Sequence, residues 1–376
     1  MKKVVAPPSK AIEQMVKGEE GAEKIGNGYI LLEYKTEKIK YIGVNQKTAG
    51  IYKIHVKTGE VSGSKTEEKS KNTLIAKAVH AAKGNSSIES KILQENTLQA
   101  KQNPIKPPRL LHRYINGPTE WIFMEELPVC DRNSQWNAKE VELLGYALGQ
   151  FNGIYRGEKL KVINNLNVSY FQKLIQAIKQ AGSTVKILMA AGEKGHHKAK
   201  KAADGLKVFL NNWLVWQHYL CQQPLVFCHN DPNFTNVKKP SKEGETSAID
   251  WEFAGLAPLG FDPAVTLWSS TSRGIYVQEK ELFAGYQKGL EIQKVQPVLS
   301  IELLFSIHIV LRAVVFPIFR QQWEYVVKTG QPKNLAMFGS WDDLQACMDI
   351  LLKHLDKVNS CIPSIPNIQG PKVKTS

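Results

Sequence analysis

VFCHNDPNFTNV, at residues 226–237, joins a short apolar run to a polar turn that contains a histidine, a carboxylate and an amide. Asp231 and Asn236 lie on this turn, and Asp250 ends a second β-branched run further along the chain. A hairpin between the two runs would bring both carboxylates and the amide together. Oxygen ligands of this kind suit Mg²⁺, and a second carboxylate nearby can receive a proton from an attacking hydroxyl. Alone, the stretch is also typical of a polar Asx/Pro turn. The Asp250 partner favours a metal-dependent site.

The two motifs resemble the catalytic loop and the metal-binding strand of kinase-fold small-molecule phosphotransferases. That superfamily includes the aminoglycoside phosphotransferases and the choline/ethanolamine kinases. The segments that carry the resemblance are CHND, IDWEFAG and GFDPA, at residues 228–231, 249–255 and 260–264. The resemblance implies an α+β, bilobal protein-kinase-like fold with a β-rich N-terminal lobe and a mainly helical C-terminal lobe.

The resemblance also implies a role for each motif residue. Asp231 is the catalytic base or the residue that orients the acceptor hydroxyl, and His229 braces the loop, where it also fits a packed, hydrogen-bonded histidine. Asn236 and Asp250 hold magnesium between the nucleotide phosphates. Asp262 is similar to the aspartate that pins the catalytic-loop backbone from a helix start, and the alternative for it is a plain helix N-cap.

Residues 1–127 are expected to form the nucleotide-binding lobe, because short β-branched and aromatic runs alternate there with turn residues. The predicted strands are residues 28–34, 38–44, 51–57, 72–79, 109–115 and 120–127. One helix is predicted within residues 86–100, where Ile88, Ile92 and Leu98 have helical spacing. Ser86 or Ser87 is a suitable N-cap for it.

Residues 128–360 are expected to form the helical, acceptor-binding lobe. The first predicted helix has apolar residues at helical spacing, namely Val141, Leu144, Leu148 and Phe151. Further helices are predicted at 169–182, 201–220 and 300–327, with a short strand at 246–253. The tail, residues 361–376, is rich in Pro, Ser and Lys and is expected to be loosely held.

Lys77 is the candidate ligand of the nucleotide phosphates, because it lies in the predicted strand LIAKAV as the phosphate-binding lysine of kinase folds does. A lysine among apolar neighbours needs a partner. Glu89 on the following helix is the expected partner, and Glu95 is the second choice. The alternative is that Lys77 is one of many surface lysines.

A hinge is expected in IFMEELP, where the backbone groups of Glu125 and Leu127 would meet the adenine edge and Met124 would lie beside the ring. The alternative is an ordinary strand end.

The loop expected to cover the phosphates is poor in glycine, with Gly50 preceded by the small residues Thr48 and Ala49. ATP and Mg²⁺ are the expected cofactors, and ATP is not distinguished from GTP.

The expected phosphate acceptor is a hydroxyl of a small molecule such as an amino alcohol, an aminoglycoside or a related metabolite. Strand alternation would place Glu252 on the same face as Asp250, where it could pair with an amine. Trp268 is an aromatic candidate for the same pocket. The alternatives are that Glu252 contacts only other site residues or faces solvent, and that Trp268 is a core residue. The competing hypothesis is a kinase-fold binding or structural protein with little catalysis.

The net charge of +14 arises mostly from lysine, with only seven arginines, so it favours a solvated lysine surface over a nucleic-acid partner. No apolar run is long enough to span a membrane. The five scattered cysteines form no CxxC pair and favour neither disulfides nor zinc. A cytoplasmic protein is expected.

Protein-kinase activity is disfavoured, because the catalytic loop lacks the Arg-Asp pair and the downstream lysine of those enzymes.

Overall fold

The computed structural model describes residues 6–17, 29–39, 48–62, 65–80, 87–127, 135–157, 178–335 and 337–362. The chain divides into two compact units. Unit 1 comprises Met1–Val129 and Ser247–Glu252, and unit 2 comprises Cys130–Thr246 and Phe253–Ser376. The segment Ser247–Glu252 therefore groups with a part of the chain that is distant in sequence. The expected lobe boundaries at residues 127 and 360 stay predictions.

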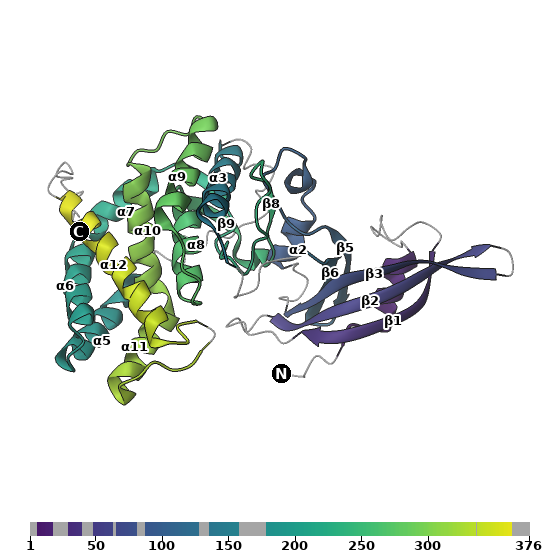
Figure 1. Cartoon of the computed structure of the whole chain (residues 1–376), viewed down its shortest axis with the longest axis horizontal. Coiled ribbons are helices and arrows are strands. Elements are labelled where there is room, and N and C mark those ends of the chain that lie inside the picture. The colour runs from purple at the N-terminus through teal and green to yellow at the C-terminus, as the bar shows by residue number, and fades with distance from the viewer. Residues whose placement is uncertain are drawn as a thin grey trace, which may run out of the picture. The chain divides into compact units, whose positions relative to one another are not determined.

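Unit 1 is built on an antiparallel five-stranded sheet in the order β1-β2-β3-β6-β5 (Figure 1). The strands are β1 Tyr29–Ile39, β2 Thr48–Ser62, β3 Lys65–His80, β5 Leu110–Asn116 and β6 Thr119–Glu125, and β4 is Ile105–Lys106. The helices are α1 Ser9–Lys17, α2 Ile88–Leu93 and the 3₁₀ helix Asn96–Gln99. The predicted hairpin of β5 and β6 is confirmed, and so is Ser87 as the N-cap of α2. Most of the predicted strand 38–44 lies outside the described residues.

The alternation of side chains along β3 gives the sheet two different faces. Leu74, Ala76 and Ala78 belong to a buried cluster that α1 covers. Val79 belongs to a second cluster, which includes Leu93 of α2. Lys77 alternates with Ala76 and Ala78 and therefore points to the face on which α2 lies.

Unit 2 is mostly helical, so the expected α+β class is confirmed (Figure 1). Its helices are α3 Ala138–Ile154, α5 Ala181–Glu193, α6 His197–Asn211, α7 Trp213–Gln222, α8 Phe261–Thr271, α9 Glu279–Ile292, α10 Ile301–Val315, α11 Pro317–Thr329 and α12 Trp341–Cys361, with a 3₁₀ turn at Ile178–Gln180. The strands β7 Leu225–Cys228 and β9 Gly255–Pro258 pair antiparallel. Most of the predicted helix 169–182 and nearly all of the tail lie outside the described residues.

The apolar stretch 300–327 forms two helices instead of one. Phe316 has an extended backbone (φ −77°, ψ 112°), as the residue before a proline prefers, and Pro317 begins α11. Among the described residues no single helix is long and apolar enough to span a membrane, and only the pair α10–α11, bent by 55° at the break, meets those criteria together.

Helices α3 and α9 approach each other through glycines. A Cβ on Gly145 would lie 2.1 Å from the Leu282 carbonyl oxygen, and one on Gly285 would lie 1.9 Å from the Glu142 carbonyl oxygen. Backbone atoms cannot yield to such contacts without moving a helix. This close packing matters for the site, because α3 also carries Asn152, which donates to the Phe227 carbonyl in β7 and to the Asp262 carboxylate.

We expect Gly285→Ala to destabilise unit 2 by about 1–3 kcal/mol through overpacking. Gly182→Ala on α5 is the matched control, because nothing lies within 4 Å of its added Cβ. The control should be neutral or stabilise by up to about 1 kcal/mol, since alanine is the better helix former. Urea unfolding of the two variants measures the difference, and equal midpoints would contradict the close-packing argument.

Candidate active site

Lys77 lies at the centre of a buried charge cluster in unit 1. Its side chain is only 5% exposed, and its Nζ lies 2.5 Å from Asp250 Oδ1, 2.7 Å from Glu89 Oε2 and 4.0 Å from Glu252 Oε2. Glu89, the expected partner, therefore contacts Lys77. The second choice, Glu95, is the N-cap residue of the 3₁₀ helix Asn96–Gln99. The alternative of a surface lysine is excluded by this burial.

The cluster perturbs the titration of its members. Burial alone would lower the pKa of Lys77, but the carboxylates of Asp250, Glu89 and Glu252 raise it well above its ordinary value. Burial raises the pKa of Glu89, and the attraction of Lys77 works in the opposite direction. Lys77 is therefore a cation held among carboxylates, and a buried titratable group perturbed in this way marks a candidate functional site.

The segment Ser247–Glu252 brings Asp250 and Glu252 into unit 1. Ala248 N donates to the Lys106 carbonyl, and the Trp251 indole N–H donates to the Ala248 carbonyl. The strand predicted at 246–253 is wrong, because only Thr246–Ser247 is extended as β8. Asp250 has a left-handed backbone (φ 65°), which ends the extended conformation, and a 3₁₀ turn begins at Trp251. Glu252 thus comes close to Lys77 through a turn and not through strand alternation.

The loop after β7 in unit 2 is fixed by Asp262 near the start of α8. Its Oδ2 accepts the His229 N–H at 3.2 Å and its Oδ1 accepts the Asn230 N–H at 2.8 Å. Asn152 on α3 donates to the same carboxylate and to the Phe227 carbonyl. The prediction that Asp262 pins the loop backbone is confirmed, and no side-chain hydrogen bond caps α8. Burial raises the pKa of Asp262, and these hydrogen bonds act in the opposite direction.

Asp231 is presented by this fixed backbone. Asn230 before it is left-handed (φ 66°), a conformation that asparagine tolerates better than most residues. The fully buried His229 accepts the Asp231 N–H at its Nδ1, at 3.3 Å, so it has the expected bracing position. Asn236 Nδ2 donates to the Asp231 carbonyl at 3.0 Å and to its Oδ2 at 3.3 Å. The turn therefore brings the carboxylate and the amide together.

Two arginines that the sequence did not single out lie beside Asp231. Arg273 Nη2 lies 3.9 Å from Asp231 Oδ2, and Arg312 Nη2 lies 3.8 Å from Oδ1. Arg273 follows α8 and Arg312 is on α10. No sequence motif links them to the loop.

At the predicted hinge, the backbone N–H of Glu125 already has a partner within the protein. The Glu125 N–H donates to the Arg109 carbonyl, and the Glu125 carboxylate accepts the Arg109 N–H. This backbone N–H is therefore not available to an adenine ring. Met124 is buried in the cluster that includes Val79, and Leu127 is partly exposed. The nucleotide contacts of all three hinge residues stay predictions.

Trp268 is fully buried on α8, where its ring packs edge-on against Phe319 at 5.3 Å and against Phe338 at 6.4 Å. These surroundings match the alternative of a core residue. The proposed acceptor contact of Trp268 stays a prediction without support from its neighbours.

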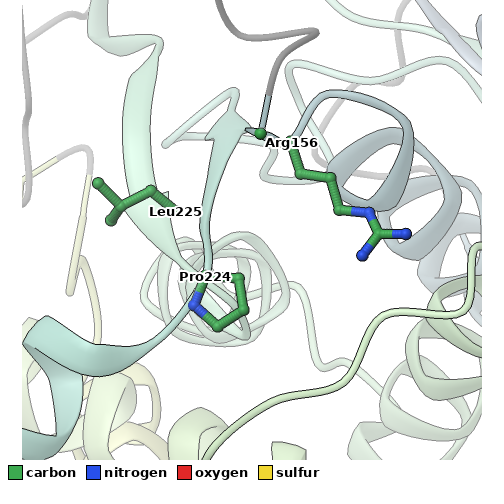
Figure 2. Close-up of a pocket in the computed structure, with 4 residues that line it drawn as sticks. Arg156, Pro224 and Leu225 are labelled. Atoms are coloured by element: carbon green, nitrogen blue, oxygen red, sulfur yellow. The ribbon is translucent and has the colours of Figure 1, made fainter.

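A surface hollow of about 520 Å³ in unit 2 is lined by Arg156, Gly157, Pro224 and Leu225. Figure 2 shows the Arg156 guanidinium directed away from Leu225, and its Nη2 donates to the Gln293 carbonyl. Leu225 begins β7, whereas the catalytic loop follows the other end of this strand. None of the predicted site residues lines this hollow.

Each unit by itself offers one hard oxygen donor. In unit 1 it is the Asp250 carboxylate, and in unit 2 it is the amide oxygen of Asn236, whose Nδ2 donates to Asp231. Hard oxygen donors in small number, completed by phosphate oxygens and water, are what magnesium prefers. No group of three or more His, Cys, Asp or Glu suited to a metal occurs in the part of the chain that the structure describes. A cation held by protein side chains alone is not indicated there.

Because Lys77 compensates buried carboxylates, we expect Lys77→Met to destabilise unit 1 by about 3–5 kcal/mol. Adding Glu89→Gln to this variant should recover part of the loss, with a coupling of about 0.5–3 kcal/mol in a double-mutant cycle followed by urea unfolding. Lys53→Met is the matched control, because the Lys53–Glu126 ion pair is about one third exposed. An exposed pair of this kind contributes about 0–1 kcal/mol. Equal losses in Lys77→Met and Lys53→Met would contradict the cluster's role.

A curated relative, choline kinase B1 of Caenorhabditis elegans, is 28% identical over 121 residues, which is 29% of this chain and 33% of that relative. The chain thus matches only about a third of the relative's length. Spectinomycin phosphotransferase, solved in complex with ADP and spectinomycin, has a similar fold with a TM-score of 0.56 at 11% identity, over 93% of this chain and 99% of that one. An ethanolamine kinase of Plasmodium vivax aligns over 85% of this chain and 81% of that one, at 13% identity and a TM-score of 0.43.

The sequence model of choline/ethanolamine kinases matches residues 61–276. This range is more than half of the chain, and it includes Lys77, the loop with Asp231, and Asp250. The resemblance found in the motifs is confirmed, and so is the kinase-like fold that it implied. The chain belongs to the choline/ethanolamine kinase family.

Proposed function

We propose that the protein is an ATP- and magnesium-dependent phosphotransferase that moves the γ-phosphate to a hydroxyl group of a small molecule. The observation that carries the proposal is an unsatisfied hydrogen-bond acceptor on Asp231. Its Oδ1 is buried and has no hydrogen-bond partner among the described residues, although the backbone around it is held by Asp262. A buried acceptor without a donor is costly, and an incoming hydroxyl would satisfy it.

The nucleotide side of the proposal rests on the cluster around Lys77. Glu89 keeps the lysine in place, as an ion pair of this kind does in kinase folds. Lys77 would then bind the nucleotide phosphates, and Asp250 and Asn236 would contribute oxygen ligands to magnesium. The metal neutralises charge on the phosphates, while the protein positions the reactants.

The acceptor is not identified by these residues. The expectation of an amine on the acceptor depended on pairing with Glu252. The Glu252 carboxylate lies 4.0 Å from Lys77 Nζ in unit 1, so it already lies close to a cation of the protein itself. Amino alcohols and aminoglycosides stay predicted acceptors, and the absence of a nucleic-acid partner and the cytoplasmic location also stay predictions. The competing hypothesis is a kinase-fold binding protein without catalysis, and the following experiments distinguish it from a working phosphotransferase.

We expect ATP together with Mg²⁺ to raise the unfolding temperature more than either does alone, because ligand binding to the native state stabilises it by mass action. Millimolar nucleotide in a thermal-shift series is sufficient. Lys77→Met should reduce the shift, whereas Lys53→Met should not. No shift in the wild-type protein would count against a nucleotide site.

Two variants separate chemistry from metal binding. Asp231→Asn should lower acceptor-dependent turnover on the order of 100- to 10,000-fold and preserve the nucleotide-dependent thermal shift, since the base acts after binding. Asp250→Asn should also reduce the magnesium-dependent part of that shift. ADP release is the readout for turnover. Full activity of Asp231→Asn would show that its assigned role is wrong.

A further inference from the structure

Tyr286 on α9 is a fully buried tyrosine whose hydroxyl makes two hydrogen bonds. It donates to Asn152 Oδ1 on α3 at 2.9 Å and accepts the Gly260 N–H at 3.0 Å. Gly260 is the N-cap residue of α8, and its left-handed backbone (φ 86°) suits a glycine. The hydroxyl of Tyr286 therefore joins α9 to α3 and to the start of α8.

Asn152 extends this connection to Asp262. Its Nδ2 donates to Asp262 Oδ2 at 3.0 Å and to the Phe227 carbonyl at 2.9 Å. A side-chain amide has one acceptor atom and one donor atom, and the acceptor atom of Asn152 receives the Tyr286 hydroxyl. The orientation of the amide is thereby fixed, because turning it over would place Oδ1 against the Asp262 carboxylate and Nδ2 against the hydroxyl proton.

Asp262 transmits this orientation to the loop backbone. Its two oxygens accept the N–H groups of His229 and Asn230. Asn230 is left-handed (φ 66°), and a backbone of this kind persists only where its surroundings over-determine it. Asp231 follows directly in the chain, so the direction of its carboxylate depends on how the Asp262 carboxylate is held.

The close approach of α3 and α9 brings the two side chains within reach of each other. A Cβ on Gly149 would lie 2.2 Å from the Tyr286 carbonyl oxygen, and one on Gly289 would lie 2.4 Å from the Tyr146 carbonyl oxygen. Larger residues at these positions would force the helices apart. The glycines therefore have a consequence for the site as well as for the packing of unit 2.

The Tyr286 hydroxyl is suited to a permanent role as a donor. Burial is the main cause that raises its pKa well above the ordinary value of a tyrosine. The group therefore keeps its proton over the pH range in which the protein is folded and active. A neutral hydroxyl that both donates and accepts satisfies Asn152 Oδ1 and the Gly260 N–H at once.

We propose that Tyr286 and Asn152 are positioning residues for Asp231 and that they act through Asp262. This inference rests on the proposed function. Hydrogen bonds from Asn152 hold the Asp262 carboxylate, Asp262 holds the loop, and the loop aims Asp231 at the acceptor hydroxyl. Geometry of this kind matters for rate, because a displacement of about 1 Å at the reacting groups can cost on the order of 100-fold.

Tyr286→Phe is the first test, because it removes one hydroxyl and keeps the buried ring. We expect kcat to fall on the order of 10- to 100-fold, since the loop is no longer aimed correctly. The KM for ATP and the thermal shift caused by ATP with Mg²⁺ should stay those of the wild-type protein. ADP release is measured with choline, ethanolamine and spectinomycin as separate acceptors and also without an acceptor.

Tyr146→Phe is the matched control. Tyr146 is also on α3, and its hydroxyl accepts a hydrogen bond from Gln150 Nε2 at 3.0 Å. The change removes a hydrogen-bonded tyrosine hydroxyl from the same helix pair, but this hydroxyl has no connection to Asp262. Tyr146→Phe should therefore leave kcat unchanged, and an equal fall in both variants would show a general loss of packing instead of positioning.

A double-mutant cycle tests whether the two residues act in series. Asn152→Ala removes the donor to Asp262, so adding Tyr286→Phe to it should cause no further fall in kcat. Non-additive effects of this kind are expected for members of one hydrogen-bond network. Losses that multiply in the double variant contradict the series. If Asn152→Ala does not fold, the comparison of Tyr286→Phe with Tyr146→Phe decides the matter.

The two proposals fail in different ways. If the wild-type protein releases ADP and Tyr286→Phe releases it with the same kcat, the positioning role is wrong and the proposed function stands. The same holds if Tyr286→Phe raises only the KM for ATP or reduces only the thermal shift. If the wild-type protein releases no ADP under any of the four conditions, the proposed function is contradicted and the positioning role falls with it.

Discussion

The attachment of the loop after β7 to Asp262 is the interaction that fixes the position of Asp231 in unit 2. One buried carboxylate accepts two successive backbone N–H groups and an amide from α3, so it ties together the loop, α3 and α8. Without these acceptors the N–H groups of His229 and Asn230 would be buried and unsatisfied, at a cost of about 1–3 kcal/mol each. The left-handed Asn230 is tolerated because this network over-determines its conformation.

Unit 1 uses buried charge in a different way. Lys77 is surrounded by three carboxylates on a sheet face that also carries apolar residues, and an arrangement of this kind is rarely the most stable solution for a core. The chain nevertheless belongs to the choline/ethanolamine kinase family, and a perturbed buried charge cluster of this kind marks a candidate functional site. On the proposed function, the Asp250 carboxylate that pairs with the lysine would also be a ligand for a hard cation.

Two arginines lie beside Asp231 in unit 2. A pocket for a quaternary ammonium group needs aromatic faces or carboxylates, whereas the described neighbours of Asp231 include two fixed guanidinium groups. The aromatic candidate Trp268 is buried instead against Phe319 and Phe338. Membership of a family therefore does not determine the acceptor, because specificity resides in the side chains around the reacting hydroxyl.

The sequence by itself indicated the class of fold, the Asp231 loop, the Lys77–Glu89 pair and the role of Asp262. These expectations came from the resemblance that its short motifs carry, whereas strand alternation and helical spacing, which act over a few residues, indicated the helices and strands. The tertiary structure alone decided that Asp250 leaves the strand through a left-handed backbone, that the Glu125 N–H is used within the sheet, and that Arg273 and Arg312 meet at Asp231. Contacts between residues far apart in sequence depend on how α8 and α10 pack, and packing is a property of the whole core that no local pattern encodes.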